Sequence, residues 1–300
     1  MANLKEIRER IKSVKSTQQI TKAMKMVAAA KLRKVQDRTV QFRPYAMRLR
    51  KILQNIHSQL EGDVSLELAQ QRQVQKAVVV LITSNKGLCG AFNSHLIKKA
   101  QSLIDERYKE LLEDERLYII TIGKKGRDFF RKHYPKARIV DDYIDILEKF
   151  DFDVASSLAD FLMRRFVDKT IDEVYVVYSE FKNPVVQIPH AEQFLPLSGF
   201  AEDEAEAPST RYLADYIYEP SKEKLLRRLI PTILRNQFYR YLLDTSASEH
   251  GARMTAMDNA TENANELLGA LRIRYNKARQ ESITREILDI VSGARALEGG

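Results

Sequence analysis

The sequence contains no tryptophan and only one cysteine, and it has few glycines and prolines, 11 and 8 residues among 300. The single cysteine, Cys89, excludes a disulfide within the chain and is typical of a reducing compartment. The scarcity of glycine and proline, with a charged fraction of 30%, favours long helices over a β-rich domain. No apolar run approaches the ~18 residues of a membrane span, and the start MANLKEIRER lacks the apolar core of a signal peptide. We therefore expect a mainly helical, soluble, cytoplasmic chain.

Positive charge is concentrated at the N-terminal end. Residues 1–60 hold 15 Lys and Arg against 3 acidic residues, whereas the remaining 240 residues hold 34 against 38. Such an excess at one end predicts an acidic partner there, which could be nucleic acid, anionic lipid or an acidic protein surface. Aromatic side chains are absent before Phe42, and clusters of base-reading side chains are missing, which argues against nucleic acid.

Residues 3–58 predict one continuous helix, since Pro44 is the only proline in this stretch and the first glycine is Gly62. The apolar positions alternate at intervals of three and four, first at Leu4, Ile7, Ile11 and Val14 and later at Ala28, Leu32 and Val35. Between these two runs, Gln18, Thr21 and Lys25 fall in the same seam. The pattern indicates a coiled coil with a polar, loosened stretch, and an ordinary amphipathic helix of a bundle is the alternative.

The middle of the chain alternates strand and helix patterns after a polar linker at residues 62–75. Strands are expected at 76–83, 117–123, 137–143 and 173–181, and helices at 93–112, 124–133 and 153–168. This order predicts a mostly parallel sheet covered by helices, a Rossmann-like α/β domain. Residues 185–196 contain prolines and are expected to return as an edge strand, and 201–210 form an acidic loop.

A second long helical pattern runs from about residue 221 to 297, interrupted by Pro231 and isolated glycines. At 1.5 Å per residue the two terminal helices would be ~84 Å and ~114 Å long, too long to be buried in one domain. They can pair with each other, which predicts an antiparallel coiled coil with segments 1–60 and 221–300 flanking a globular domain at 61–220. The unequal lengths leave about 20 residues, ~30 Å, of the last helix without a partner. The apolar residues of this overhang are Ile283, Ile287, Leu288, Ile290, Val291 and Leu297.

The sequence has only weak matches to motifs for phosphate binding, nucleophilic catalysis or metal binding. The segments TSNKGLCGAFN (83–93) and GKKG (123–126) could be phosphate-binding turns, but they match neither G-x-G-x-x-G nor G-x-x-x-x-G-K-[ST], so structural tight turns are favoured. Cys89 beside Lys86 could be reactive, although a buried thiol is the commoner case. The five histidines are each more than 30 residues apart, so none forms a helical ligand pair. We expect no active site, metal or cofactor.

Three segments have a recognisable sequence: LKEIRERIKSVKSTQQITKAMKMVAAAKL (4–32), TSNKGLCGAFN (83–93) and the tail from ASEHGARMTAMDNATENANELLG to SGARAL (247–297). These segments resemble the F-type ATP synthase gamma subunit family, of bacterial type. The resemblance covers essentially the whole chain. It implies a non-catalytic central rotor shaft whose terminal helices turn inside an alpha/beta hexamer. It also implies that the globular domain rests on a membrane c-ring beside an epsilon subunit, one copy per complex.

The resemblance also assigns roles to individual residues. It implies contact with the hexamer for Lys22, Met24, Lys25, Glu249, Arg253, Arg279, Gln280 and Thr284. It implies contact with the c-ring for Tyr216, Tyr218 and Glu219. A thiol switch of the chloroplast type is not expected with one cysteine. The alternatives are a nucleotide-binding α/β enzyme and a basic coiled-coil adaptor for nucleic acid or membranes.

Overall fold

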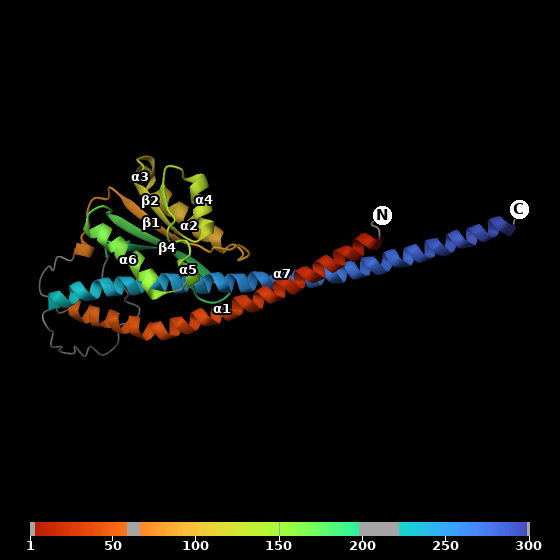
Figure 1. Cartoon of the computed structure of the whole chain (residues 1–300), viewed down its shortest axis with the longest axis horizontal. Coiled ribbons are helices and arrows are strands. Elements are labelled where there is room, and N and C mark those ends of the chain that lie inside the picture. The colour runs from red at the N-terminus through yellow and green to blue at the C-terminus, as the bar shows by residue number, and fades with distance from the viewer. Residues whose placement is uncertain (1–3, 59–66, 150, 198–221, 299–300) are drawn as a thin grey trace. The chain divides into compact units, whose positions relative to one another are not determined.

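The computed structural model describes residues 4–58, 67–149, 151–197 and 222–298 (Figure 1). The chain divides into two compact units, one made of Met1–Ala29 with Arg253–Gly300 and the other of Ala30–Ala252. The first unit therefore combines the two ends of the chain, and the second unit is the continuous segment between them.

A long helix lies toward each end of the chain, as the sequence predicts. Helix α1 is Leu4–Ser58 and helix α7 is Lys222–Glu298. Pro44 and Pro231 lie inside these helices and do not end them. The predicted interruption at Pro231 is therefore not observed.

The second unit is built on a five-stranded sheet in the order β3-β2-β1-β4-β5. The strands are β1 (Ala77–Ile82), β2 (Leu117–Ile122), β3 (Arg138–Val140), β4 (Glu173–Phe181) and β5 (Gln187–Leu195). The first four run parallel, and β5 pairs antiparallel with β4 at the edge. The mostly parallel sheet and the edge strand are both confirmed. All six residues of β1 are buried because this central strand is covered on both faces.

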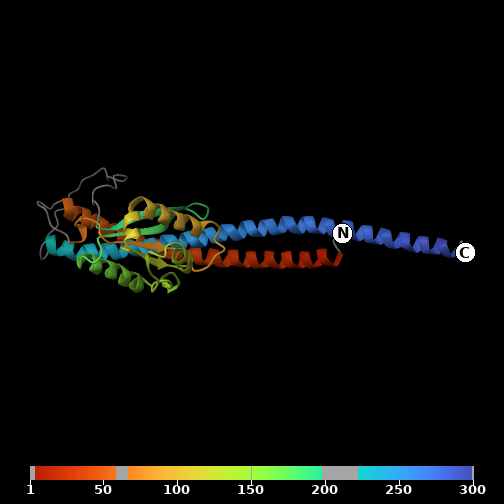
Figure 2. The same ribbon diagram turned by 90° about the horizontal axis from the view of Figure 1, so that it is seen from above.

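Helices cover the two faces of this sheet (Figures 1 and 2). The helices are α2 (Phe92–Arg107), α3 (Lys109–Glu113), α4 (Lys124–His133), α5 (Ile146–Lys149) and α6 (Phe152–Val167), with a 3₁₀ turn at Glu67–Ala69. One apolar core joins the sheet to α2 and α4. The other joins it to α6 and to the first part of α7, which buries Leu226, Ile230, Leu234, Phe238 and Tyr241. The beginning of α7 is therefore part of the α/β core.

The single helix expected at 93–112 is instead two helices that meet at Tyr108. Tyr108 is 2% exposed, and its hydroxyl donates a 2.5 Å hydrogen bond to the Glu173 carboxylate on β4. Its backbone has left the helical region, with φ −124° and ψ 18°. The break therefore serves a tertiary contact that local periodicity does not encode.

Within the second unit, helix α1 packs on α7 through a small apolar cluster. Leu32 and Val35 of α1 contact Leu243 and Ala247 of α7, and all four side chains are buried. About two helical turns further along α1, the Phe42 ring meets Tyr239 edge to face at 5.3 Å. This part of α1 is held to the α/β domain mainly by its contacts with α7.

The turn after β2 depends on a glycine. Gly123 has φ +100°, and a Cβ on this residue would lie 2.1 Å from the Thr83 carbonyl oxygen. The Thr83 hydroxyl in turn accepts a 2.9 Å hydrogen bond from the Gly126 backbone N–H. The GKKG segment therefore brings the start of α4 against the end of β1, with no room for a side chain at its first position.

Replacing Gly123 tests this arrangement. Gly123→Ala should lower the free energy of unfolding by at least about 2 kcal/mol, because it combines a strained φ with a backbone clash. Gly269→Ala is the matched control, since a Cβ there meets nothing within 4 Å on a regular helix, and it should leave stability unchanged or slightly raised. The measurement is chemical denaturation of the two variants and the parent; equal midpoints for Gly123→Ala and the parent would contradict the packing described.

Candidate functional site

The turn at residues 83–93 directs its polar groups inward. The Asn93 side chain accepts a 3.0 Å hydrogen bond from the Ser84 backbone N–H and donates one of 2.8 Å to the Ser84 hydroxyl. Cys89 is 1% exposed, with its sulfur 3.2 Å from the Asn93 amide nitrogen. A phosphate site needs N–H groups that point outward at a ligand. This geometry fits a structural turn and a buried thiol.

Within residues 4–58, 67–149, 151–197 and 222–298, no group of three or more His, Cys, Asp or Glu side chains could hold a metal ion. Over the same ranges, no helix is long and apolar enough to cross a membrane. In the described residues, the surfaces of the long helices α1 and α7 are therefore the candidate functional site.

In the first unit, α1 and α7 form an antiparallel pair with a polar layer in its seam. Thr21 and Thr261 share a hydrogen bond of 2.8 Å between their hydroxyls. On either side of them, the Lys25 ammonium lies 2.5 Å from the Asp258 carboxylate, and Gln18 donates to Asn265. Thr21 is 8% exposed, so the layer crosses the seam itself. The polar stretch predicted at Gln18, Thr21 and Lys25 is confirmed.

Apolar contacts flank this layer at the predicted spacing. On α1 the buried seam residues of this unit are Ile7 and Ala28. On α7 they are Met257, Ala264, Leu268 and Leu271. The remaining predicted positions of the first run, Leu4, Ile11 and Val14, are half-buried. The alternation of three and four therefore marks a real helix–helix seam.

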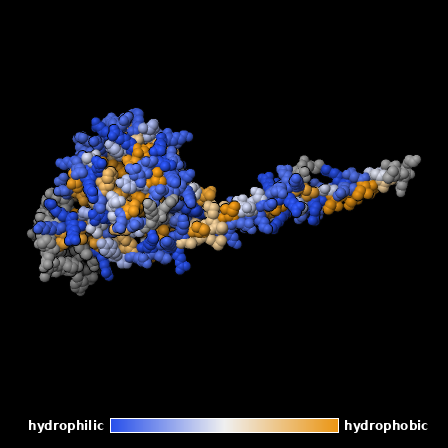
Figure 3. All heavy atoms as spheres, in the orientation of Figure 1, coloured by the Kyte–Doolittle hydropathy of each residue, from blue (hydrophilic) through white to orange (hydrophobic). Residues whose placement is uncertain are grey.

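The C-terminal end of α7 extends beyond the start of α1. Lys25 faces Asp258 and Gln18 faces Asn265, so this register brings Leu4 level with the residues around Arg279. All residues from 281 to 294 are exposed. Among them are the apolar Ile283, Ile287, Leu288, Ile290 and Val291, between 42% and 67% exposed. Figure 3 shows apolar surface along this terminal arm. The predicted overhang is confirmed as a geometric feature.

Comparison with known proteins decides the family. The family model described as ATP synthase matches residues 3–297. The ATP synthase gamma chain of Cytophaga hutchinsonii is 48% identical over 297 residues, 99% of both chains, and that of Chloroherpeton thalassium is 46% identical over 303 residues, again 99% of both.

The chain belongs to the ATP synthase gamma chain family. It is accordingly a subunit of ATP synthase. A chain in a solved structure of the Euglena gracilis mitochondrial ATP synthase, comprising OSCP, F1 and the c-ring, has the same fold, with a TM-score of 0.65 at 22% identity over 99% of this chain and 95% of that one. The combination of two long terminal helices and a central α/β domain is therefore the gamma chain fold.

Three of the residues assigned to hexamer contact by family resemblance lie on α1, close to the polar layer. Lys22 is exposed, whereas Met24 and Lys25 are half-buried. Lys25 already has an intramolecular partner in Asp258. Lys22 is thus the more available of the two cations for a partner chain.

The other assigned residues differ in their surroundings. Arg279, Gln280 and Thr284 are exposed near and beyond the end of the paired region, while Arg253 is half-buried and Glu249, in the second unit, is only 9% exposed. Tyr216, Tyr218 and Glu219, assigned to the c-ring, lie outside the described residues. The assigned set therefore does not form one cluster, and Glu249 offers little surface to a partner.

Asp258, Thr261 and Asn265 complete the polar layer, and sequence reasoning missed them. They lie on α7 at intervals of three and four, so they share one helix face. A search for polar residues at seam spacing on α7, opposite Gln18, Thr21 and Lys25, could have found them.

A second polar cluster, between α7 and β5, was also missed. The Arg240 guanidinium lies 3.5 Å from the Glu192 carboxylate, which also accepts hydrogen bonds from Tyr178 and Gln237 at 2.9 and 2.8 Å. Asp244 is one turn beyond Arg240. The pKa of Asp244 is raised to about 6, mainly because the carboxyl is buried; Arg240 opposes this shift, and the nearby carboxylates of Glu180 and Glu192 add to it. The folded chain therefore holds a carboxyl that titrates close to neutral pH.

This shift predicts a pH-dependent contribution to stability. The pKa of Asp244 is higher in the folded than in the unfolded chain, where it is near 3.9, so ionisation above pH 4 progressively favours unfolding. Asp244→Asn should raise the melting temperature at pH 7 to 8 by a few degrees and change it little at pH 4. Melting curves across this range make the test, with Asp105→Asn on the exposed face of α2 as control. An equal effect of Asp244→Asn at pH 4 and pH 8 would contradict the shift.

Proposed function

We propose that this chain is the central rotor shaft of ATP synthase. It couples rotation of the membrane c-ring to the conformational cycling of catalytic sites on the alpha/beta hexamer, and it is not itself catalytic. The observation that carries the proposal is the family match over residues 3–297, which includes both long helices. As part of a bacterial-type complex, the chain is proposed to be peripheral, on the cytoplasmic side of the plasma membrane, with epsilon beside it.

The continuity of helix α7 is suited to a shaft that transmits torque. Helix α7 is continuous from Lys222 to Glu298, and its first third is buried in the α/β core. A torque applied to that core therefore passes into the helix without a flexible joint. The helix pair also has exposed cations on α1 and ends in a single helix. It is therefore not rotationally symmetric, and each catalytic site would meet a different surface at each angle. We propose that Tyr216, Tyr218 and Glu219 contact the c-ring.

Purification from native membranes tests the function. The chain should be isolated as a single copy together with one alpha/beta hexamer, epsilon and the c-ring, and nucleic acid should be absent. Isolation of the chain alone, hydrolysing ATP by itself, would overturn the proposal in favour of a nucleotide-binding enzyme.

The exposed cations of α1 are proposed to guide the shaft past acidic hexamer loops. Lys22, Lys31, Arg33 and Lys34 are all exposed, whereas Lys25 is paired with Asp258. Single neutralisations should matter little, because an exposed ion pair contributes ~0–1 kcal/mol. Changing all four to Gln should lower the ATP made per transported ion by about half, as the attraction is summed over the group.

The matched control changes four exposed lysines of the α/β domain, Lys98, Lys99, Lys109 and Lys132, to Gln. This control alters the net charge equally and should leave coupling unchanged. Equal coupling in the two variants, measured in reconstituted vesicles, would exclude a specific role for the α1 cations.

The exposed apolar end of α7 is proposed to insert into an apolar sleeve of the hexamer. Apolar contacts are non-directional, so they can hold an axle laterally without fixing its angle. Deleting residues 284–300 should lower the melting temperature of the assembled complex while rotation continues, because the paired part of the helices remains. A full-length variant with Ile287, Ile290 and Val291 changed to Gln should show most of the same loss. A melting temperature that neither change alters would reject the sleeve.

A further inference from the structure

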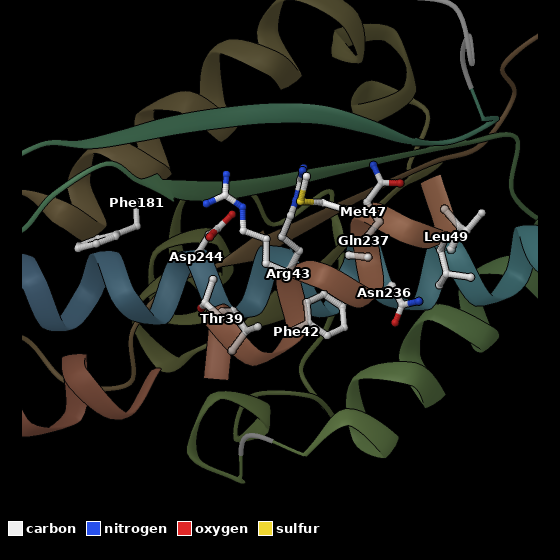
Figure 4. A pocket seen from close by; sticks show the side chains of 13 residues that line it. Thr39, Phe42, Arg43, Met47, Leu49, Phe181, Asn236, Gln237 and Asp244 are labelled. Carbon is white, nitrogen blue, oxygen red and sulfur yellow. The ribbon is translucent and has the colours of Figure 1, made fainter. Parts of the chain in front are cut away.

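A cavity lies between α1 and α7 inside the second unit, next to the contact of Phe42 with Tyr239. Its volume is about 480 Å³, within the range of small-molecule sites. Figure 4 shows side chains of both helices lining it, with Phe42, Arg43 and Met47 from α1 and Asn236, Gln237 and Asp244 from α7. Phe181, the last residue of β4, also lines it. None of the proposed rotor contacts involves this space.

The cavity contains polar groups without hydrogen-bond partners. Asn236 is 4% exposed, and in the described part of the chain neither its amide nitrogen nor its amide oxygen has a partner. The buried Nε of Arg240, one helical turn along on the same face, likewise lacks an acceptor among the described residues. A buried amide and N–H left unpaired cost about 1–3 kcal/mol each, so the arrangement is favourable only when something in the cavity supplies the missing bonds.

The charges in this cavity favour a neutral occupant. Arg240 is balanced by Glu192 at 3.5 Å and by the neighbouring Asp244 carboxyl, and Arg43 adds a cation at the exposed rim. An additional buried charge would lose its hydration without a buried counter-charge that is not already paired. The unmet groups are instead two amide donors, an amide acceptor and a single N–H, which match the donor and acceptor edge of an amide.

The apolar part of the lining indicates the shape and polarity of the rest of the ligand. Phe42 and Leu243 face the space from opposite helices, and Met47 offers a flexible, polarisable side chain at the opening. Aromatic rings and sulfur pack well against a flat aromatic surface.

We propose that this cavity binds a neutral, flat, aromatic small molecule that carries a primary or cyclic amide, with the amide paired to Asn236. Binding there would connect α1 to α7 within the α/β domain. The site is independent of the rotor function, because it depends only on contacts inside one unit of the chain.

The test uses 2-naphthamide as probe, with 2-naphthoate and 2-naphthamidine as anionic and cationic counterparts of the same shape. Binding to the complete chain is followed by NMR of ¹³C-methyl methionine, since the sequence has seven methionines and, of those in the described residues, Met47 alone lines the cavity. Titration with naphthamide should shift the Met47 signal, which Met47→Leu assigns. The charged counterparts should bind at least about tenfold more weakly.

Two variants locate the ligand. Asn236→Leu removes the amide partner and should weaken naphthamide binding about tenfold or more, while Ala46→Phe should block the cavity. Asn276→Leu, at an exposed position of the same helix, is the matched control and should bind like the parent. The Met47 titration is carried out on the parent chain, and Met47→Leu serves only to assign the signal, so the titration decides even where Asn236→Leu or Ala46→Phe impairs folding. The proposal is overturned if millimolar naphthamide leaves the Met47 signal unmoved, if Asn236→Leu binds equally well, or if the charged probes bind as tightly.

Discussion

The pairing of two helices from opposite ends of the chain is the constraint on which the structure depends. Leu32 and Val35 meet Leu243 and Ala247 in one unit, and Lys25, Thr21 and Gln18 meet Asp258, Thr261 and Asn265 in the other. For this pairing, the roughly 160 residues between the helices must bring the chain back beside its own beginning. A mostly parallel sheet does this, and α7 begins as one of the helices that cover it.

The polar layer fixes the register of the pair at a cost in stability. An apolar seam alone would tolerate a shift by one heptad, because one buried aliphatic side chain can replace another. The hydroxyl pair of Thr21 and Thr261 and the two flanking polar pairs would all be lost in a shifted register. The same layer replaces buried apolar contacts by polar ones, which contribute less to stability.

Much of this architecture can be predicted from the sequence, because long helices and buried strands have strong periodic patterns. The bounds of β4, the edge position of β5 and the unpaired end of α7 follow from pattern and length. The break at Tyr108 could not be predicted, since it depends on a hydrogen bond to Glu173, 65 residues away. The unpaired amide of Asn236 was equally inaccessible, because an asparagine on a helix gives no sign of which side chains will surround it.

Direct observation of rotation tests the account most directly. Lys98→Cys offers an exposed thiol on α2, and Cys89 is 1% exposed and therefore protected from labelling. With the alpha/beta hexamer fixed to a surface and a bead attached at position 98, addition of ATP should turn the bead continuously in one direction. A bead that stays at a fixed angle while the same complexes hydrolyse ATP would contradict the role of this chain as the shaft.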